Sequence, residues 1–130
     1  MPKEEQLEYF KHPFAATDII IEYSTEEKHG IVLIERKNPP YGIAIPGGFA
    51  EIGLSLEENA RKEAKEETNL DVILENPEHP LCVKSKPERD PRNHVMSMVY
   101  VARGIGELKA GDDAKKARLY SIDEVIDLMQ

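Results

Sequence analysis

The chain has 130 residues, a formal net charge of -8, hydrophobic side chains at 40% of its positions and a single cysteine, Cys82. That length is typical of one domain, residues 1–130, whose core needs no structural metal, and one cysteine excludes an internal disulfide. The sequence has no apolar run of about 20 residues that could span a bilayer, and its acidic charge disfavours binding to nucleic acid. We therefore expect a cytoplasmic protein that binds neither a membrane nor nucleic acid.

The first third of the chain contains short β-branched runs. Residues 16–23 and 31–36 predict two adjacent strands, because a polar, glycine-containing segment separates them as in a hairpin. Residues 38–42 contain two prolines, which lack an amide donor, so they predict a loop. The short apolar strand 43–45 then leads into Pro46-Gly47-Gly48, where glycines permit backbone approaches that a side chain would block.

Next comes the most strongly predicted helix. Ser55 and Glu58 have the spacing of a capping box. Apolar residues follow at four-residue spacing from Leu56 to Ala64, so they lie on one face of the helix. Asn69 suits a left-handed C-cap. We therefore expect a stable helix between these two caps.

The second half of the chain predicts further strands over 70–74, 81–84 and 94–102, with prolines in the loops between them. The last strand is apolar on both faces and is therefore expected to be central. A short strand at 118–120 precedes a second capping-box pattern, which begins at Ser121 and predicts a C-terminal helix. The expected fold is an α/β or α+β sandwich, a mixed central β-sheet flanked by helices.

Three carboxylates of the main helix share one patch. Glu63, Glu66 and Glu67 have i, i+3 and i+4 spacing, which places them on the same side. Hard cations such as Mg²⁺ prefer oxygen ligands and are usually held by carboxylates together with substrate phosphates. The patch predicts one wall of a metal and pyrophosphate site. The alternative is the solvated face of a helix rich in Glu and Lys.

The stretch from Gly48 to Leu70 reads GFAEIGLSLEENARKEAKEETNL and resembles the Nudix box, G-x5-E-x7-R-E-U-x-E-E-x-G-U with U apolar. It departs from the box at three positions, with Leu54 in place of Glu, Lys62 in place of Arg and Asn69 in place of Gly. The order of strand, glycine loop, helix and strand is also similar to the family. We therefore expect a Nudix fold over most of the chain.

The three departures do not weigh equally. Asn69 is a mild change, because Asn tolerates the left-handed conformation. The family's Glu and Arg, at the positions of Leu54 and Lys62, are thought to pair and to orient the catalytic helix. Replacing both partners of an ion pair can be nearly neutral, whereas losing one leaves an orphan charge. We expect the fold to survive, so catalytic rate is the property at risk.

The resemblance implies a hydrolase that uses Mg²⁺ or Mn²⁺. Residue by residue it implies metal ligation by Glu66 and Glu67, with Glu66 also part of the catalytic group. Glu63 would be a metal ligand or the catalytic base that activates water, and the carbonyl of Gly48 a further ligand. Gly47 and Gly48 would also contact the substrate.

Acids outside these positions are further candidates. Glu51 in the glycine loop is either a substrate-binding acid or a solvated one. In the family a base can also come from a loop acid outside the box. Asp112 and Asp113 are the catalytic candidates of that kind, weighed against an ordinary turn.

Segments 35–42 and 88–94 look like the ADP-ribose pyrophosphatase branch of the Nudix family. That likeness implies a small nucleotide substrate, ADP-ribose, and the products AMP and ribose 5-phosphate. Arg36, Arg89 and Arg92 offer bidentate donors to pyrophosphate or ribose oxygens. The alternative is that they are surface arginines paired with nearby acids.

Other functions stay open. The same branch includes domains that sense ADP-ribose and carry eroded boxes, which Leu54 and Lys62 favour. Such sensors are usually attached to a DNA-binding domain, and the sequence shows no basic helix for one. A third possibility is a Nudix enzyme acting on nucleoside triphosphates or dinucleoside polyphosphates. We expect a homodimer, because relatives in this branch are often dimers.

Overall fold

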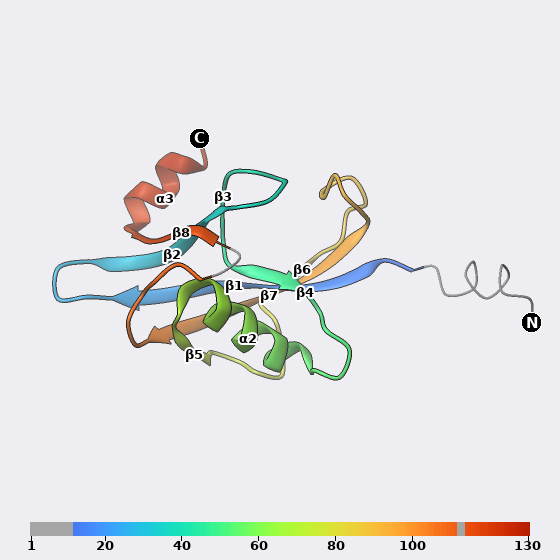
Figure 1. The fold of residues 1–130 in the computed structure, drawn as a ribbon, viewed down its shortest axis with the longest axis horizontal. Coiled ribbons are helices and arrows are strands. Elements are labelled where there is room, and N and C mark those ends of the chain that lie inside the picture. The colour runs from blue at the N-terminus through green and yellow to red at the C-terminus, as the bar shows by residue number, and fades with distance from the viewer. Residues whose placement is uncertain (1–11, 112–113) are drawn as a thin grey trace, which may run out of the picture.

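The computed structural model of the chain describes residues 12–111 and 114–130. These residues form one eight-stranded mixed sheet and two helices (Figure 1). The strands are β1 (Phe14–Ser24), β2 (His29–Arg36), β3 (Ile43–Ala44), β4 (Gly47–Phe49), β5 (Asp71–Leu74), β6 (Cys82–Lys84), β7 (Val95–Ile105) and β8 (Ala114–Tyr120). The helices are α2 (Leu56–Thr68) and α3 (Ile122–Leu128). The predicted mixed sheet with helices is confirmed.

The sheet is built around two long strands. Its main path is β3-β2-β1-β7-β5, with β4 paired to β1, β6 to β7 and β8 to β2. β1 and β7 run parallel, from Phe14 opposite Val95 to Glu22 opposite Arg103, and the remaining pairs are antiparallel. The predicted hairpin of the first two strands and the central place of the 94–102 strand are both confirmed.

Helix α2 is held in place by its apolar face. Ala60 and Ala64 are fully buried, in one cluster with Ile19, Ile21 and Leu70. Small side chains at these positions let the helix lie close to the sheet, where it contacts β5, β1 and β4 (Figure 1). Helix α3 contacts β2 and β8 at the other side and buries none of its residues. The core therefore fixes α2, the helix that carries the three box acids.

The helix caps follow the sequence closely. Ser55 Oγ accepts from the backbone N–H of Glu58 at 3.2 Å, and Asn69 adopts the left-handed conformation at φ 67°. Ser121 and Glu124 form the complete capping box before α3. At the first cap the box is altered, because Ser55 Oγ donates to the Glu58 carboxylate instead of leaving that carboxylate to the cap backbone. The predicted caps at Ser55, Asn69 and Ser121 are confirmed, and the reciprocal capping box is complete only before α3.

Two strands differ from the prediction. The glycine segment, expected as a loop, is strand β4, with Thr17 opposite Gly48 and Asp18 opposite Gly47. Strand β8 begins at Ala114 rather than 118, because its ladder with β2 extends to Arg36. In both cases a partner strand distant in sequence supplies the hydrogen bonds. Neither described helix has the length and apolar character to cross a membrane.

Candidate active site

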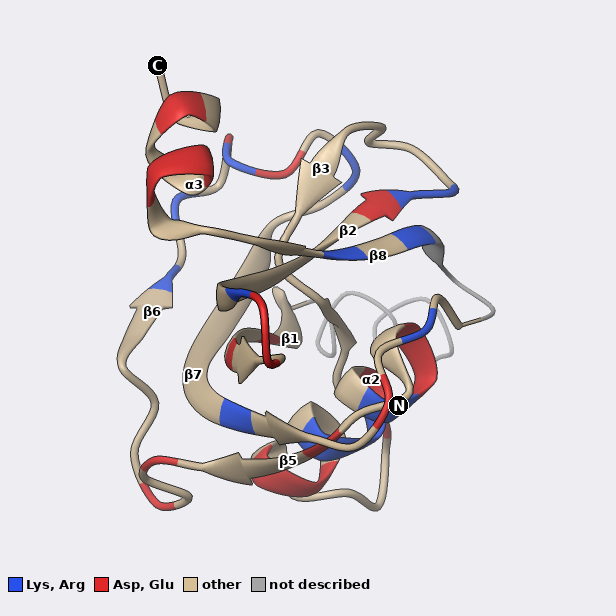
Figure 2. Cartoon of the chain, turned by 90° about the vertical axis from the view of Figure 1, so that its left-hand side faces the viewer, with Lys and Arg blue, Asp and Glu red and all other residues tan. Residues whose placement is uncertain are grey.

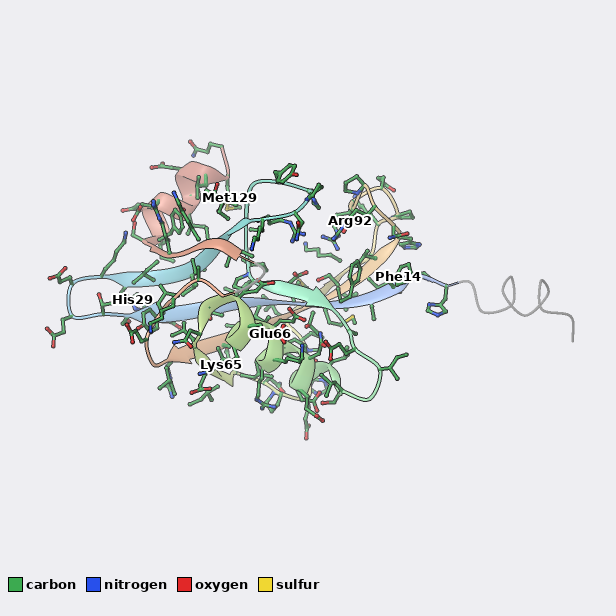
Figure 3. All side chains as sticks on the ribbon, in the orientation of Figure 1. Phe14, His29, Lys65, Glu66, Arg92 and Met129 are labelled. Atoms are coloured by element: carbon green, nitrogen blue, oxygen red, sulfur yellow. The ribbon has the colours of Figure 1, made fainter. Side chains whose placement is uncertain are left out.

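A cleft of about 800 Å³ opens beside β4 and is lined by β1, β2, β6, β7, α2 and the loop before β7. It collects most of the residues expected from the sequence, namely Arg36, Gly47, Gly48, Glu51, Glu63, Glu67, Arg89 and Arg92. Glu66 is not part of this lining, although it lies on the same helix (Figure 3). Arg36 and Arg92, which are 56 positions apart in the chain, thus line the same cleft.

The two glycines of β4 let acids lie against the backbone. A Cβ on Gly48 would be 2.6 Å from Glu63 Oε2, and a Cβ on Gly47 would be 2.1 Å from Asp18 Oδ1. The N–H of Gly47 donates to Glu67 Oε2 at 3.2 Å. The absence of both side chains is therefore a steric requirement for placing these carboxylates.

Glu63 and Glu67 are the buried acids of the helix. They are 8% and 4% exposed, one helical turn apart. Buried charges need compensation by hydrogen bonds or by cations, and carboxylate oxygens suit a hard divalent ion. Among residues 12–111 and 114–130, no three Asp, Glu, His or Cys side chains already form a metal-binding group. A Mg²⁺ ion typically completes such a shell with water and substrate phosphates, so the donor set fits.

Lys62 connects α2 to the loop that follows β4. Its Nζ lies 2.8 Å from Glu51 Oε1 and also pairs with the Glu66 carboxylate. The hydrogen bond with Glu51, and then that with Glu66, raises the pKa of Lys62 above its usual range. Figure 2 shows that α2 carries both acidic and basic positions. Glu51 is thus a salt-bridged acid at the rim of the cleft, and Glu66 is engaged beside it.

Asn59 was not singled out from the sequence, although it is fully buried behind the loop that follows β4. Its Oδ1 accepts from Glu51 N at 3.1 Å, and its Nδ2 donates to Thr17 Oγ1 at 2.9 Å and Phe49 O at 3.3 Å. One side chain therefore ties the glycine loop to both α2 and β1. The sequence did contain a signal for this role. Asn59 is a weak helix former inside a predicted helix, four residues before Glu63.

The three candidate arginines have different surroundings. Arg36 Nε is buried and has no hydrogen-bond partner among the described residues. Arg92 Nε and Nη2 both donate to the Asp90 carboxylate, at 3.0 and 2.7 Å, and its guanidinium lies 5.0 Å from the Phe49 ring centroid. The hydrogen bond from Arg92 lowers the pKa of Asp90 to about 2. Arg89 lines the same cleft.

Asp18 lines the cleft and was also missed by sequence reasoning. Ser97 Oγ donates to Asp18 Oδ2 across the β1–β7 pair. Burial raises the pKa of the Asp18 carboxyl above its usual value, against the opposing effects of Ser97 and of the arginines. Its sequence signal was weak, because Asp18 stands at the head of an apolar run and resembles an ordinary strand residue.

The remaining catalytic candidates, Asp112 and Asp113, lie outside the described residues. The residue before them can be placed. The N–H of Gly111 donates to Glu67 O at 3.0 Å, and a Cβ there would be 1.3 Å from Glu66 O. Gly111 is therefore packed against the backbone of the last turns of α2.

The fold thus places two buried acids against a glycine strand beside a cleft that contains three arginines, a donor set suited to a divalent cation and an anionic group. The family model for the NUDIX domain matches residues 13–130. The chain belongs to the Nudix family, and the resemblance of its box is confirmed.

Among known proteins, the chain is 44% identical over 119 residues to an ADP-ribose pyrophosphatase of Methanocaldococcus jannaschii. The match covers 89% of this chain and 66% of the relative, so the chain spans slightly less than two thirds of that protein's length. A MutT/nudix family protein of Enterococcus faecalis is 30% identical with a TM-score of 0.72, covering 92% of this chain and 51% of that one. The NUDIX domain of Shewanella oneidensis NrtR, crystallised with ADP ribose, is 19% identical with a TM-score of 0.76 over 98% and 88%, which shows the shared fold.

Proposed function

We propose that the chain is a Mg²⁺- or Mn²⁺-dependent Nudix hydrolase that cleaves ADP-ribose into AMP and ribose 5-phosphate. The observation that carries the proposal is the pair of buried carboxylates, Glu63 and Glu67, against the Gly47-Gly48 backbone in a cleft that also contains Arg36. The 44% identity to a protein named ADP-ribose pyrophosphatase supports the choice of substrate.

The residues divide into two groups by what they hold. Glu63, Glu67 and the carbonyl of Gly48 would hold the cation, with Glu66 added when it leaves Lys62. The bound cation neutralises pyrophosphate charge and makes a bound water more acidic. Arg36 would donate its unpartnered Nε–H to a phosphate or ribose oxygen. Water then attacks one phosphorus, the P–O–P bridge breaks, and each product keeps one phosphate.

The remaining assignment is the general base. Glu63 is one candidate, because its carboxylate lies against Gly48 inside the cleft. Asp112 and Asp113 are the others, as loop acids outside the box. The base must be within hydrogen-bond reach of the attacking water. Comparing kcat of Glu63→Gln, Asp112→Asn and Asp113→Asn identifies it as the variant with the greatest loss and an altered pH profile.

A second candidate function is binding of ADP-ribose without turnover. Two observations favour this function. Leu54 stands in place of a box acid, and the Glu66 carboxylate is engaged by Lys62. A domain of this kind would keep the cleft and its arginines but would have lost catalytic turnover. Nucleoside triphosphates and dinucleoside polyphosphates are alternative substrates that product analysis separates.

The test is AMP release from ADP-ribose with Mg²⁺ or Mn²⁺, beside calorimetric binding. Glu67→Gln and Glu66→Gln remove proposed ligands, and Glu57→Gln removes an acid of the same helix that does not line the cleft. Loss of AMP release in the first two variants, with normal release in the third, supports the hydrolase. Binding by the wild type with no AMP release contradicts it and supports a sensor.

We also propose a cytoplasmic homodimer with no nucleic-acid partner. The net charge of -8 and the lone Cys82 support the partner and compartment assignments. Sedimentation at micromolar concentration tests the dimer, and a single species of 14.7 kDa would contradict it.

A further inference from the structure

The cleft contains an acid that the proposed reaction does not use. Asp18 lies on β1 directly opposite Gly47, and it lines the same cleft as Arg36 and Arg89. A carboxylate in a site for an anionic pyrophosphate opposes binding by like-charge repulsion. Its presence needs a compensating interaction with the ligand or with the protein.

The described part of the protein compensates the negative charge of Asp18 only in part. Ser97 Oγ donates to Oδ2, which fixes the carboxylate across the two central strands. In the described part of the chain, neither Arg36 nor Arg89 forms an ion pair with Asp18. A carboxylate has about four lone-pair sites, so Asp18 keeps capacity to accept hydrogen bonds from a ligand.

The position of Asp18 limits what that ligand group is. Gly47, its ladder partner, precedes Gly48 and donates to Glu67, so Asp18 borders the subsite proposed for the pyrophosphate. In ADP-ribose, both neighbours of the pyrophosphate are ribose units, which carry hydroxyl donors. In a nucleoside triphosphate, one of those neighbours is a third phosphate, which has acceptors and negative charge.

From this geometry we propose that Asp18 is a specificity-determining residue, which accepts a hydrogen bond from a sugar hydroxyl beside the pyrophosphate and disfavours nucleotides with a third phosphate. The inference rests on the proposed function for the position of the pyrophosphate. Sites built to hydrogen-bond a hydroxyl reject ligands that lack it far more strongly than apolar sites do. Ser97 is the positioning residue for this carboxylate.

The test uses Asp18→Asn, because Asn keeps an acceptor for Ser97 and a similar volume while removing the charge. We measure kcat/KM for ADP-ribose and for ATP with Mg²⁺. We expect kcat/KM for ADP-ribose to fall by about 10- to 100-fold, the size of one charge-assisted hydrogen bond, through a higher KM. The use or binding of ATP should improve. Ser97→Ala shifts the ratio of the two substrates in the same direction and by less.

A matched control keeps charge loss separate from site chemistry. Asp71→Asn removes an aspartate that is largely exposed and outside the cleft, and it leaves the substrate ratio unchanged. If Asp18→Asn changes both substrates by the same factor, or changes neither, Asp18 has a structural role and the proposal is overturned.

The failure of the proposed function is distinguishable from the failure of this inference. If the wild type releases no AMP, its complexes with ADP-ribose and ATP are stable, so calorimetry in Mg²⁺ gives both dissociation constants directly. Asp18→Asn then weakens ADP-ribose relative to ATP if the inference holds. An unchanged ratio of the two dissociation constants overturns it.

Discussion

Lys62 Nζ lies 2.8 Å from Glu51 Oε1, so α2 is joined to the loop after β4 by an ion pair that does not involve position 54. Leu54 is half-buried, and its N–H donates to Glu51 O at 3.2 Å. The charged pair that the Nudix box places at positions 54 and 62 is thus replaced here by one between 51 and 62. This arrangement also holds Glu66 on the same ammonium group.

Removing the ammonium group tests that arrangement. Lys62→Met frees the Glu66 carboxylate and takes a positive charge away from the proposed cation site, so Mn²⁺ should bind several-fold more tightly. The measurement is the Mn²⁺ dissociation constant by calorimetry, with Lys62→Arg as the control that keeps the charge. Equal or weaker Mn²⁺ binding in Lys62→Met would contradict the role of Lys62 as a competing counter-ion.

Gly48→Ala should abolish most activity without unfolding the protein. The new Cβ would be 2.6 Å from the Glu63 carboxylate, so that side chain has to move from its place in the cleft. We expect kcat to fall by at least about tenfold, because small displacements of catalytic groups are costly. Gly106→Ala, at φ 108° with open space around it, controls for backbone strain and should retain kcat. Comparable losses of kcat in both variants would contradict a specific displacement of Glu63.

Asn59→Ala should destabilise the fold. The substitution leaves the Glu51 N–H without its side-chain partner and removes two donated hydrogen bonds inside the core. We expect the free energy of unfolding to fall by about 1–3 kcal/mol, the typical penalty for a buried polar group left unpaired. Urea denaturation measures it. Asn76→Ala, at an exposed turn, should change stability by less than about 0.5 kcal/mol; similar values for the two variants would be contrary to the buried role.

Arg36→Met should raise KM for ADP-ribose. Its Nε is buried without a partner among the described residues, and such a donor is satisfied when a ligand oxygen reaches it. Loss of one hydrogen bond to a charged group corresponds to about 10-fold or more in binding. Arg103→Met, an exposed change on β7, is the matched control. A KM that is the same in wild type and Arg36→Met would remove Arg36 from the substrate site.

The loop before β7 should respond to acid through Asp90. Its pKa is lowered by Arg92 to about 2 from the ordinary 3.8, so the pair stabilises the folded state above the ordinary pKa and loses that contribution as pH falls through about 2. The difference in melting temperature between wild type and Asp90→Asn should therefore narrow as pH falls from 5 towards 2. The difference in melting temperature between wild type and Arg92→Met should narrow in the same way. A difference that stays constant over this range would disprove the pairing in solution.

Local patterns in the sequence were sufficient for the catalytic helix and its box. Helix caps at Ser55 and Asn69, and the grouping of Glu63 with Glu67, depend on residues three or four positions apart. Alternating and β-branched runs were likewise sufficient for the central strands, although not for their ends. For these features the physical cause lies within one or two turns of the same element.

Tertiary structure alone decided which residues face the cleft. Asp18 meets Gly47, and Lys62 meets Glu51, only because β1 pairs with β4 and α2 lies beside the loop after it. The inward position of Glu67 and the sideways position of Glu66 were also undecided, because helical spacing places both on one patch without saying which side the sheet covers. Strand register and helix docking are set by the burial of the whole core, which no short segment encodes.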